Sequence, residues 1–161
     1  FLSTICSDWE GQANKLKNTS FCLLRVGVVL SKKGGVLQKL LCPFSIHLGA
    51  VLGNGKQKIS WIHIDDVCRM IIFCVKHGKD ELFNCVSPNP VSNKEFSISL
   101  AKVLKRKIWL PNIPSFMLKA TFGEMFTMIV GSLNVSSKKI ERSGFKFNFP
   151  KLSKALENLI N

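Results

Sequence analysis

The sequence predicts an α/β protein whose strands pair in parallel. Strand-like and helix-like segments alternate along the first hundred residues, which is the pattern of βαβ units. The run at 21–30 is short, rich in β-branched residues and almost wholly apolar, as in strands buried on both faces of a parallel sheet. After residue 108 the pattern is mostly helical. The strand-like segments are too few for a whole doubly wound sheet.

The first element is a predicted helix at 1–16, because Leu2, Ile5 and Trp9 recur at helical spacing. Since this pattern is present from the first residue, we expect the chain to begin inside a helix and to be a fragment or a processed product. The later elements follow in order: a strand at 21–30, a helix at 36–47, a turn at 53–55, a strand at 58–64, a helix at 66–76, a strand at 82–86, a helix opened by a capping box at 92–95, one or two helices from 108, a helix from 136 to 144, and a last helix after Pro150.

The segment 58–66 carries the densest polar signal. Alternation along the strand puts its residues on two faces, with Ser60, Ile62 and Ile64 on one and Ile59, Trp61 and His63 on the other. We expect Asp65 or Asp66 to cap the helix at 66–76, and we expect that helix to be well buried because it is apolar nearly all round. Gly78 is its predicted end.

The chain is strongly basic, with a formal net charge of +13 over 161 residues. Such a charge can attract nucleic acid, anionic lipid or a phosphorylated ligand. The basic residues are spread along the chain, and their densest cluster (Lys102, Lys105, Arg106, Lys107) lies at the end of a predicted helix, where the helix dipole favours cations. Compositional bias therefore explains the charge more simply, and we expect no nucleic-acid partner.

The six cysteines show no C-x-x-C pair and no zinc spacing, so we predict no metal site and interpret them as reduced, structural thiols of a cytoplasmic protein. No secretory signal is visible. The most apolar long stretch, 116–133, contains Lys119 and Glu124, so we expect no membrane span. An interfacial helix there is an alternative, but a core helix is the commoner explanation.

Motifs for familiar chemistry are missing from these residues. Gly53-Asn54-Gly55 has two glycines without the third of a dinucleotide loop, and it leads into a strand. Neither a phosphate loop of the G-x-x-x-x-G-K-[ST] type nor a G-x-S-x-G nucleophile is present. We therefore assign no catalytic residue.

Two polar residues in apolar strands have open interpretations. His63 beside Asp65 could be a tuned acid/base group, but a buried hydrogen-bonded histidine is the alternative and the one that the spacing favours. Arg25 must be paired or must contact an anion, and a buried ion pair supporting the sheet is as good an explanation as a ligand. Gly27, with no side chain, allows a close approach of backbone or ligand.

Several blocks of the sequence together carry a family resemblance. They are Trp9-Glu10, Leu24-Arg25-Val26-Gly27-Val28-Val29-Leu30, Gly34-Gly35, Pro43-Phe44, Leu48-Gly49, Gly53-Asn54-Gly55-Lys56-Gln57, Ser60-Trp61-Ile62-His63-Ile64-Asp65-Asp66, Phe83-Asn84, Ser87-Pro88-Asn89-Pro90-Val91, Gly123-Glu124 and Gly144-Phe145. In this order they resemble the epimerase family of atypical, extended short-chain dehydrogenases/reductases, over essentially the whole chain.

The resemblance implies the C-terminal portion of an NAD(P)-binding Rossmann fold plus a smaller, mostly helical substrate lobe. It divides the chain into the end of the Rossmann domain at 1–32, a substrate-lobe segment at 33–107 with a strand and helix returning to the Rossmann sheet, and a helical module at 108–161. The family's Gly-rich cofactor loop and its Tyr-x-x-x-Lys pair are both absent here, and the chain contains no tyrosine.

The resemblance also implies site residues. Gly27, Val28 and Val29 match the strand beside the nicotinamide end of NADP or NAD. Gln57, Trp61 and His63 match positions that face the cleft and contact substrate. The implied function is part of a nucleoside-diphosphate-sugar epimerase-like oxidoreductase, inactive alone, with a nucleotide sugar as substrate and the missing N-terminal half as partner. A non-catalytic remnant or partner-binding protein is the alternative, and a basic nucleic-acid or membrane-surface binder is a third.

Overall fold

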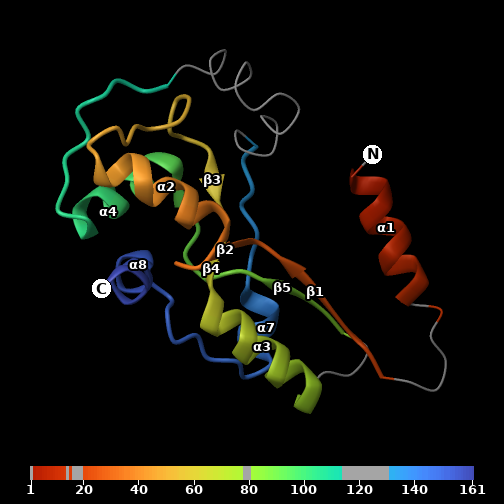
Figure 1. The fold of residues 1–161 in the computed structure, drawn as a ribbon. Coiled ribbons are helices and arrows are strands. Elements are labelled where there is room, and N and C mark those ends of the chain that lie inside the picture. The colour runs from red at the N-terminus through yellow and green to blue at the C-terminus, as the bar shows by residue number, and fades with distance from the viewer. Residues whose placement is uncertain (1, 14, 16–19, 78–80, 114–130) are drawn as a thin grey trace.

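A computed structural model describes residues 2–13, 15, 20–77, 81–113 and 131–161. Figure 1 shows the elements within these ranges. In chain order they are α1 (Leu2–Ala13), β1 (Cys22–Val26), β2 (Val28–Leu30), α2 (Gly35–Ser45), β3 (Lys58–Ile59), β4 (Trp61–His63), α3 (Ile64–His77), β5 (Glu81–Cys85), β6 (Val91–Ser92), α4 (Asn93–Val103), α7 (Lys138–Arg142) and α8 (Leu152–Ile160). The predicted α/β class is confirmed, while Gly78 and most of 116–133 lie outside the described residues.

The strands pair two by two. β1 and β5 are parallel, with Cys22 opposite Glu81 and Val26 opposite Cys85. β2 and β4 are parallel as well, whereas the short β3 and β6 are antiparallel, a pair that the sequence did not predict. Parallel neighbours need a crossover connection, and α2 lies in the chain between the paired strands β2 and β4.

The predicted single strand at 21–30 is in fact two strands that meet at Gly27. Before the glycine the chain pairs with β5, and after it the chain pairs with β4. The Gly27 amide donates to the Cys85 carbonyl at 3.1 Å, and the next amide, of Val28, donates to the Ser60 carbonyl at 2.8 Å. One apolar run therefore serves two strand pairs, which its hydrophobicity alone cannot reveal.

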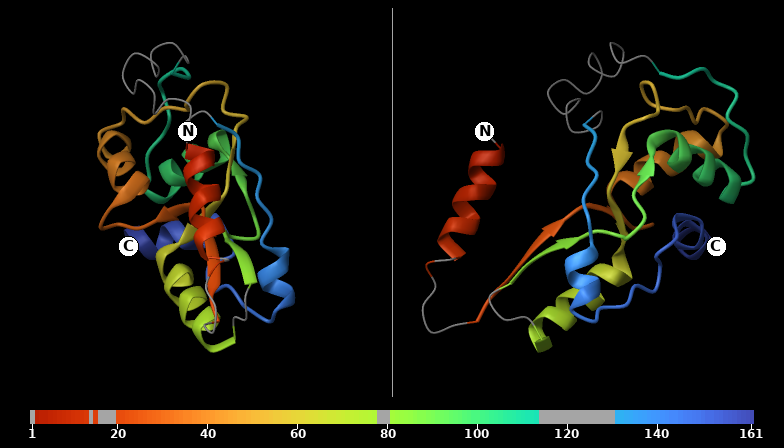
Figure 2. Two further views of the ribbon diagram at one scale, coloured as in Figure 1. Left: turned by 90° about the vertical axis from the view of Figure 1, so that its right-hand side faces the viewer. Right: turned by 180° about the vertical axis from the view of Figure 1, so that it is seen from behind.

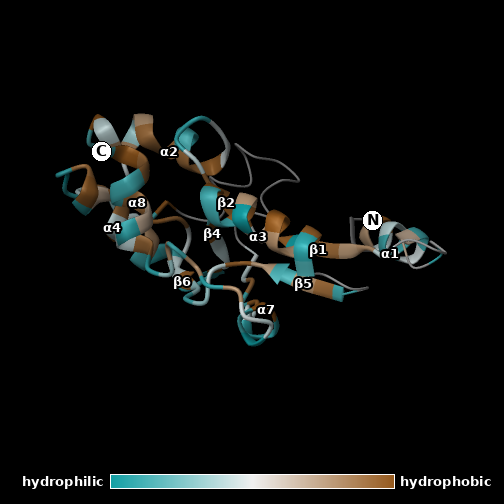
Figure 3. Ribbon diagram, turned by 90° about the horizontal axis from the view of Figure 1, so that it is seen from below, coloured by the Kyte–Doolittle hydropathy of each residue, from teal (hydrophilic) through white to brown (hydrophobic). Residues whose placement is uncertain are grey.

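Two apolar clusters flank β4. Trp61 belongs to the first cluster, with α2, α4 and α8, and Ile62 belongs to the second, with α3, α7 and β5. The predicted alternation is thus confirmed for these neighbours, which point to opposite sides. Figures 2 and 3 show the same division, with α2, α4 and α8 gathered at one end of the molecule.

The prediction that the helix at 66–76 is well buried is correct for one side of the helix and wrong for the other. α3 buries Val67, Met70 and Cys74 against the second cluster. Its other side exposes Ile71, Ile72 and Val75, the last at 82%. Apolar composition measures how much surface a helix would bury, but only packing decides which side is covered.

Helix α4 begins and ends with well-defined caps. The predicted capping box is present, because the Ser92 amide donates to Glu95 Oε2 at 2.6 Å and the Ser92 hydroxyl accepts from the Glu95 amide at 3.2 Å. The bond from the Ser92 amide lowers the pKa of the Glu95 carboxyl. At the other end Lys105 has a left-handed φ of 55°. Its backbone amide donates a hydrogen bond to the Lys102 carbonyl, and the Arg106 amide donates one to the Ala101 carbonyl. This pattern is a Schellman motif, in which the left-handed position is usually glycine.

We predict that Lys105→Gly stabilises the protein. A left-handed backbone costs a non-glycine residue about 1 kcal/mol, which glycine avoids. Chemical denaturation should show a free energy of unfolding raised by up to about 1 kcal/mol. Lys102→Gly, one turn earlier in the helix, should lower it by about 1 kcal/mol instead. A loss of stability in Lys105→Gly would contradict the assignment.

Candidate cofactor and substrate site

The predicted cofactor strand lies where the two parallel pairs meet. A Cβ at Gly27 would lie 2.5 Å from the Ser60 carbonyl oxygen and 2.7 Å from Val86 Cγ1. The space beside the glycine is therefore filled by the protein itself. Val28 and Val29 are half-buried, and they pack against the first and the second cluster respectively.

Trp61 is fully buried on β4, opposite Val28 of β2. Its indole nitrogen donates to the Asn89 carbonyl at 2.9 Å, and its own carbonyl accepts from the Ser87 amide at 2.7 Å. Ser87 and Asn89 also reach the Pro150 carbonyl, at 3.2 and 2.9 Å. The tryptophan thereby fixes the 87–90 loop between β4 and the approach to α8.

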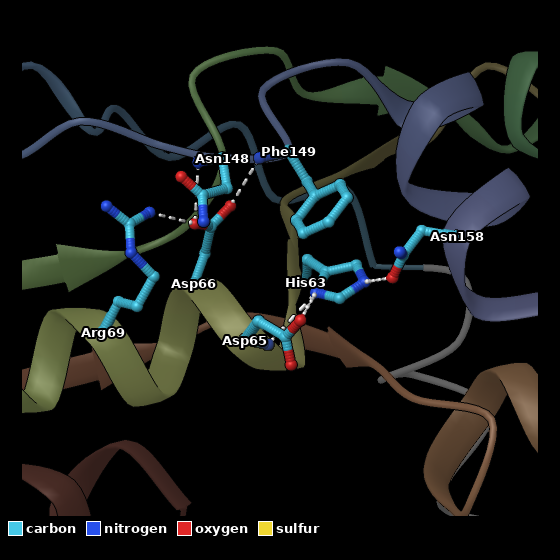
Figure 4. Close-up of polar contacts among 7 residues, drawn as sticks. All are labelled: His63, Asp65, Asp66, Arg69, Asn148, Phe149 and Asn158. Atoms are coloured by element: carbon cyan, nitrogen blue, oxygen red, sulfur yellow. Dashed lines mark hydrogen bonds and ion pairs between the residues drawn. The ribbon is translucent and has the colours of Figure 1, made fainter.

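His63 is 1% exposed and uses both ring nitrogens internally, as Figure 4 shows. Its Nδ1 accepts from the Asp65 amide at 3.0 Å, and its Nε2 lies 3.1 Å from Asn158 Oδ1. Because Nδ1 accepts, we assign the proton to Nε2, which then donates to Asn158. The ring also stacks on Phe149 at 3.9 Å between centroids. These contacts with described residues favour a structural role for His63 over an acid/base role.

Asp66 is fully buried, and its carboxylate binds a distant segment instead of capping α3. The Asn148 amide donates to Oδ1 at 2.8 Å and the Phe149 amide to Oδ2 at 2.9 Å. Arg69 Nη1 donates to Oδ1 at 3.0 Å and also to the Lys146 carbonyl at 2.9 Å. A buried charge needs this many donors, so Asp66 and Arg69 together hold the 146–149 segment on α3 (Figure 4).

Gln57 is 7% exposed at the end of the 52–57 turn. Its side-chain amide donates to the Leu52 carbonyl at 2.9 Å, and its backbone carbonyl accepts from the Asn93 amide at 2.9 Å. The Asn93 side chain in turn accepts from the Leu52 amide at 2.9 Å. Gln57 therefore closes the turn onto the start of α4.

Arg25 is paired with a carboxylate, but the pair is not buried. Its Nε and Nη2 donate to the two oxygens of Glu10 on α1, both at 2.7 Å. Of the two alternatives that the sequence left open, the ion pair is present, but the Arg25 side chain is 58% exposed, so the pair is not a buried one. The hydrogen bond from Arg25 lowers the pKa of the Glu10 carboxyl.

Four of the six predicted site residues lie on the two paired strands β2 and β4, and a fifth, Gly27, directly precedes β2. Val28 lies opposite Trp61, Val29 opposite Ile62 and Leu30 opposite His63. Gln57 lies apart, before β3. The sequence missed the binding of Asp66 to 148–149 and the stacking of Phe149 on His63; its only signals were the adjacent Asp65-Asp66 and the alternating phenylalanines at 145–149.

No group of three or more histidine, cysteine or acidic side chains among the described residues is placed to hold a metal ion. None of the helices in the described ranges is both long and apolar enough to cross a membrane.

The fold and the strand arrangement define the class of the protein. The structure superposes on the human epimerase family protein SDR39U1 (isoform 2), solved with NADPH, with a TM-score of 0.91 and 29% identity, covering 98% of this chain and 54% of that one. A nucleoside-diphosphate sugar epimerase of Corynebacterium glutamicum superposes with a TM-score of 0.71 and 25% identity, covering 99% of this chain and 31% of that one. The fold is thus that of the Rossmann-type, NAD(P)-binding epimerases and reductases.

The sequence comparison then gives the family. Residues 3–85 match the model of the NAD dependent epimerase/dehydratase family, and residues 113–159 match a domain of unknown function. The chain belongs to the NAD dependent epimerase/dehydratase family. An epimerase family protein of Staphylococcus epidermidis is 38% identical over 99% of this chain and 54% of its own length. The chloroplastic SDR39U1 homolog of Arabidopsis thaliana is 36% identical over 99% of this chain and 46% of its own length, so the chain spans about half the length of these relatives.

We predict that Asp66→Asn lowers the free energy of unfolding by about 2–4 kcal/mol. An amide offers one acceptor oxygen where two backbone amides and Arg69 need a carboxylate, and it turns an N–H group toward one of these donors. Chemical denaturation measures the change.

Asp65→Asn is the matched control, because Asp65 precedes Asp66 on α3 with its side chain 62% exposed. This substitution should lower the free energy of unfolding by less than about 1 kcal/mol. Equal losses in the two variants would show that Asp66 does not hold the 146–149 segment.

We also predict that two of the six thiols resist modification in the native state. Burial raises the pKa of Cys74 to about 12 and that of Cys85 to about 11, with smaller contributions from Cys22 and Asp66 respectively. Because the thiolate is the reactive form, both groups are almost fully protonated at about pH 8. Peptide mapping after alkylation should find the exposed Cys6, Cys42 and Cys68 labelled first.

In guanidinium, all six cysteines should label at similar rates. Labelling of native Cys85 as fast as that of Cys68 would contradict the burial of the second cluster.

Proposed function

We propose that this chain is the C-terminal part of an NAD(P)-dependent, nucleoside-diphosphate-sugar epimerase-like oxidoreductase. The superposition on a human relative solved with NADPH, at a TM-score of 0.91 over 98% of the chain, carries the proposal. The nucleoside-diphosphate sugar epimerase of Corynebacterium glutamicum supports nucleotide sugars as the substrate class.

The cofactor, NADP or NAD, would lie against β2. Val28 and Val29 are half-buried there, on the strand that pairs with β4. Gly27 contributes indirectly, because the space at its Cα is filled by Ser60 and Val86. When bound, the nicotinamide would supply hydride exchange, and the protein would supply orientation and exclusion of water.

The substrate side would be shaped by β4 and the turn before β3. Direct contact of Gln57, Trp61 and His63 with substrate stays a prediction. These side chains hydrogen-bond to Leu52, Asn89 and Asn158. We therefore propose that they hold β4 and the turn before β3 in place. Rigid, internally bonded residues of this kind preserve the geometry of a site.

The remaining machinery would come from a further protein segment as partner. The 161 residues contain neither a G-x-G-x-x-G loop for the cofactor phosphates nor a tyrosine for a Tyr-x-x-x-Lys pair. We therefore propose that this half is inactive by itself. The six free thiols support a reducing compartment such as the cytoplasm.

The test is calorimetric titration of the complete gene product with NADPH and NADH. We expect saturable binding of at least one dinucleotide. Gly27→Ala should weaken that binding at least about tenfold, because a Cβ there displaces the backbone at Ser60. Gly11→Ala is the control, since a Cβ at Gly11 meets nothing within 4 Å.

Circular dichroism of both variants separates lost binding from lost folding. A folded complete protein that binds neither dinucleotide would overturn the proposal and favour a non-catalytic, partner-binding role.

A further inference from the structure

The end of α4 carries a basic and apolar surface that the proposed function does not use. We call it the α4 patch, and its residues, all exposed, are Ile98, Lys102, Lys105, Arg106, Lys107, Trp109 and Leu110. Trp109 is 72% exposed, Ile98 49% and Leu110 41%. The sequence holds no aspartate or glutamate between Glu95 and Glu124, so no acidic residue within this stretch offsets the four cations.

The residues of the patch are brought together by the way α4 ends. Ile98 and Lys102 are four residues apart and share one side of the helix. The Schellman turn at Lys105 then redirects the chain, so that 106–110 leaves the helix on the outside of the molecule, as Figures 1 and 2 show for the trace after α4. The Lys107 ammonium lies 5.8 Å from the centre of the Trp109 ring.

Lys105 adds an independent observation. The backbone at this position has a φ of 55°, which favours glycine, yet the chain places a cation there. Strain of this kind points to a use for the side chain beyond the fold itself. Its neighbours Lys102, Arg106 and Lys107 are also cations, and together the four attract negative charge.

We propose that the α4 patch docks the protein on an anionic bilayer surface. Trp109 and Leu110 enter the headgroup region, where the amphipathic indole is favoured, while the four cations approach the anionic lipid headgroups. Long cationic side chains suit this arrangement because their stems cover apolar surface while their charged ends stay hydrated.

The aliphatic residues favour lipid over nucleic acid. Single-stranded nucleic acid binds through cations interleaved with several stacking aromatic rings, whereas this patch has one ring beside Ile98 and Leu110. Those two side chains gain from an apolar environment and offer no group that bonds to a base. A lipid surface uses all seven residues.

The test uses the full chain and vesicles of equal parts phosphatidylcholine and phosphatidylserine. We expect tryptophan emission to shift to the blue on binding, because Trp109 leaves water. Trp109→Phe should abolish the shift and Trp9→Phe should retain it, which is a close control because both indoles are 72% exposed. Trp61 is fully buried and contributes no shift.

The charge requirement is tested by vesicle sedimentation. Each cation near an anionic surface contributes about fivefold in partitioning, roughly 1 kcal/mol, so Lys105→Gln with Lys107→Gln should reduce binding on the order of 30-fold. Lys138→Gln with Arg142→Gln removes the same charge from exposed positions on α7, away from the patch, and should change binding by only a few-fold.

Four results would each overturn the proposal. They are no binding to anionic vesicles, a blue shift that survives Trp109→Phe, equal losses in the two charge variants, and patch-dependent binding to single-stranded RNA in place of vesicles. Loss of binding in the patch variants alone, with unchanged circular dichroism, supports it.

Discussion

The close approach of three chain segments at Gly27 is the constraint on which the rest of the structure depends. A single apolar run passes from one parallel pair to the other at this point, with the Ser60 carbonyl and the Val86 side chain in the space that a Cβ would take. Since neighbouring residues of a strand point to opposite faces, Trp61 and Ile62 of β4 belong to two different apolar clusters, one on each side of the strand. Any side chain at Gly27 would separate the strands that carry the candidate site.

A second set of contacts ties the C-terminal residues to this junction. Asp66 binds the amides of Asn148 and Phe149, and His63 bonds to Asn158 on α8. These are polar groups removed from water, and each is satisfied, as native interiors require. The hydrogen bonds fix the positions of the segments that they join, whereas the apolar clusters supply most of the free energy of burial.

Local chemistry made much of the fold predictable from the sequence. The capping box at Ser92 and the alternation around Trp61 depend on neighbours a few residues away, and the structure confirms both. The division at Gly27, the uncovered side of α3 and the partners of Asp66 depend on segments far along the chain, so no periodicity could show them. The location of the site stays a prediction; the structure pairs the strands β2 and β4 that carry most of its proposed residues, and the inward hydrogen bonds of Trp61 and His63 could not be predicted.

The distance along the chain between Asp66 and its partners has a consequence for how the protein is made. The contacts join residues 82 and 83 positions apart, which raises the contact order and makes this closure an entropically expensive step of folding. During synthesis the N-terminal strands and α3 emerge first. Asp66 therefore stays hydrated, and the surface that later receives residues 148 and 149 stays open, until those two residues have left the ribosome.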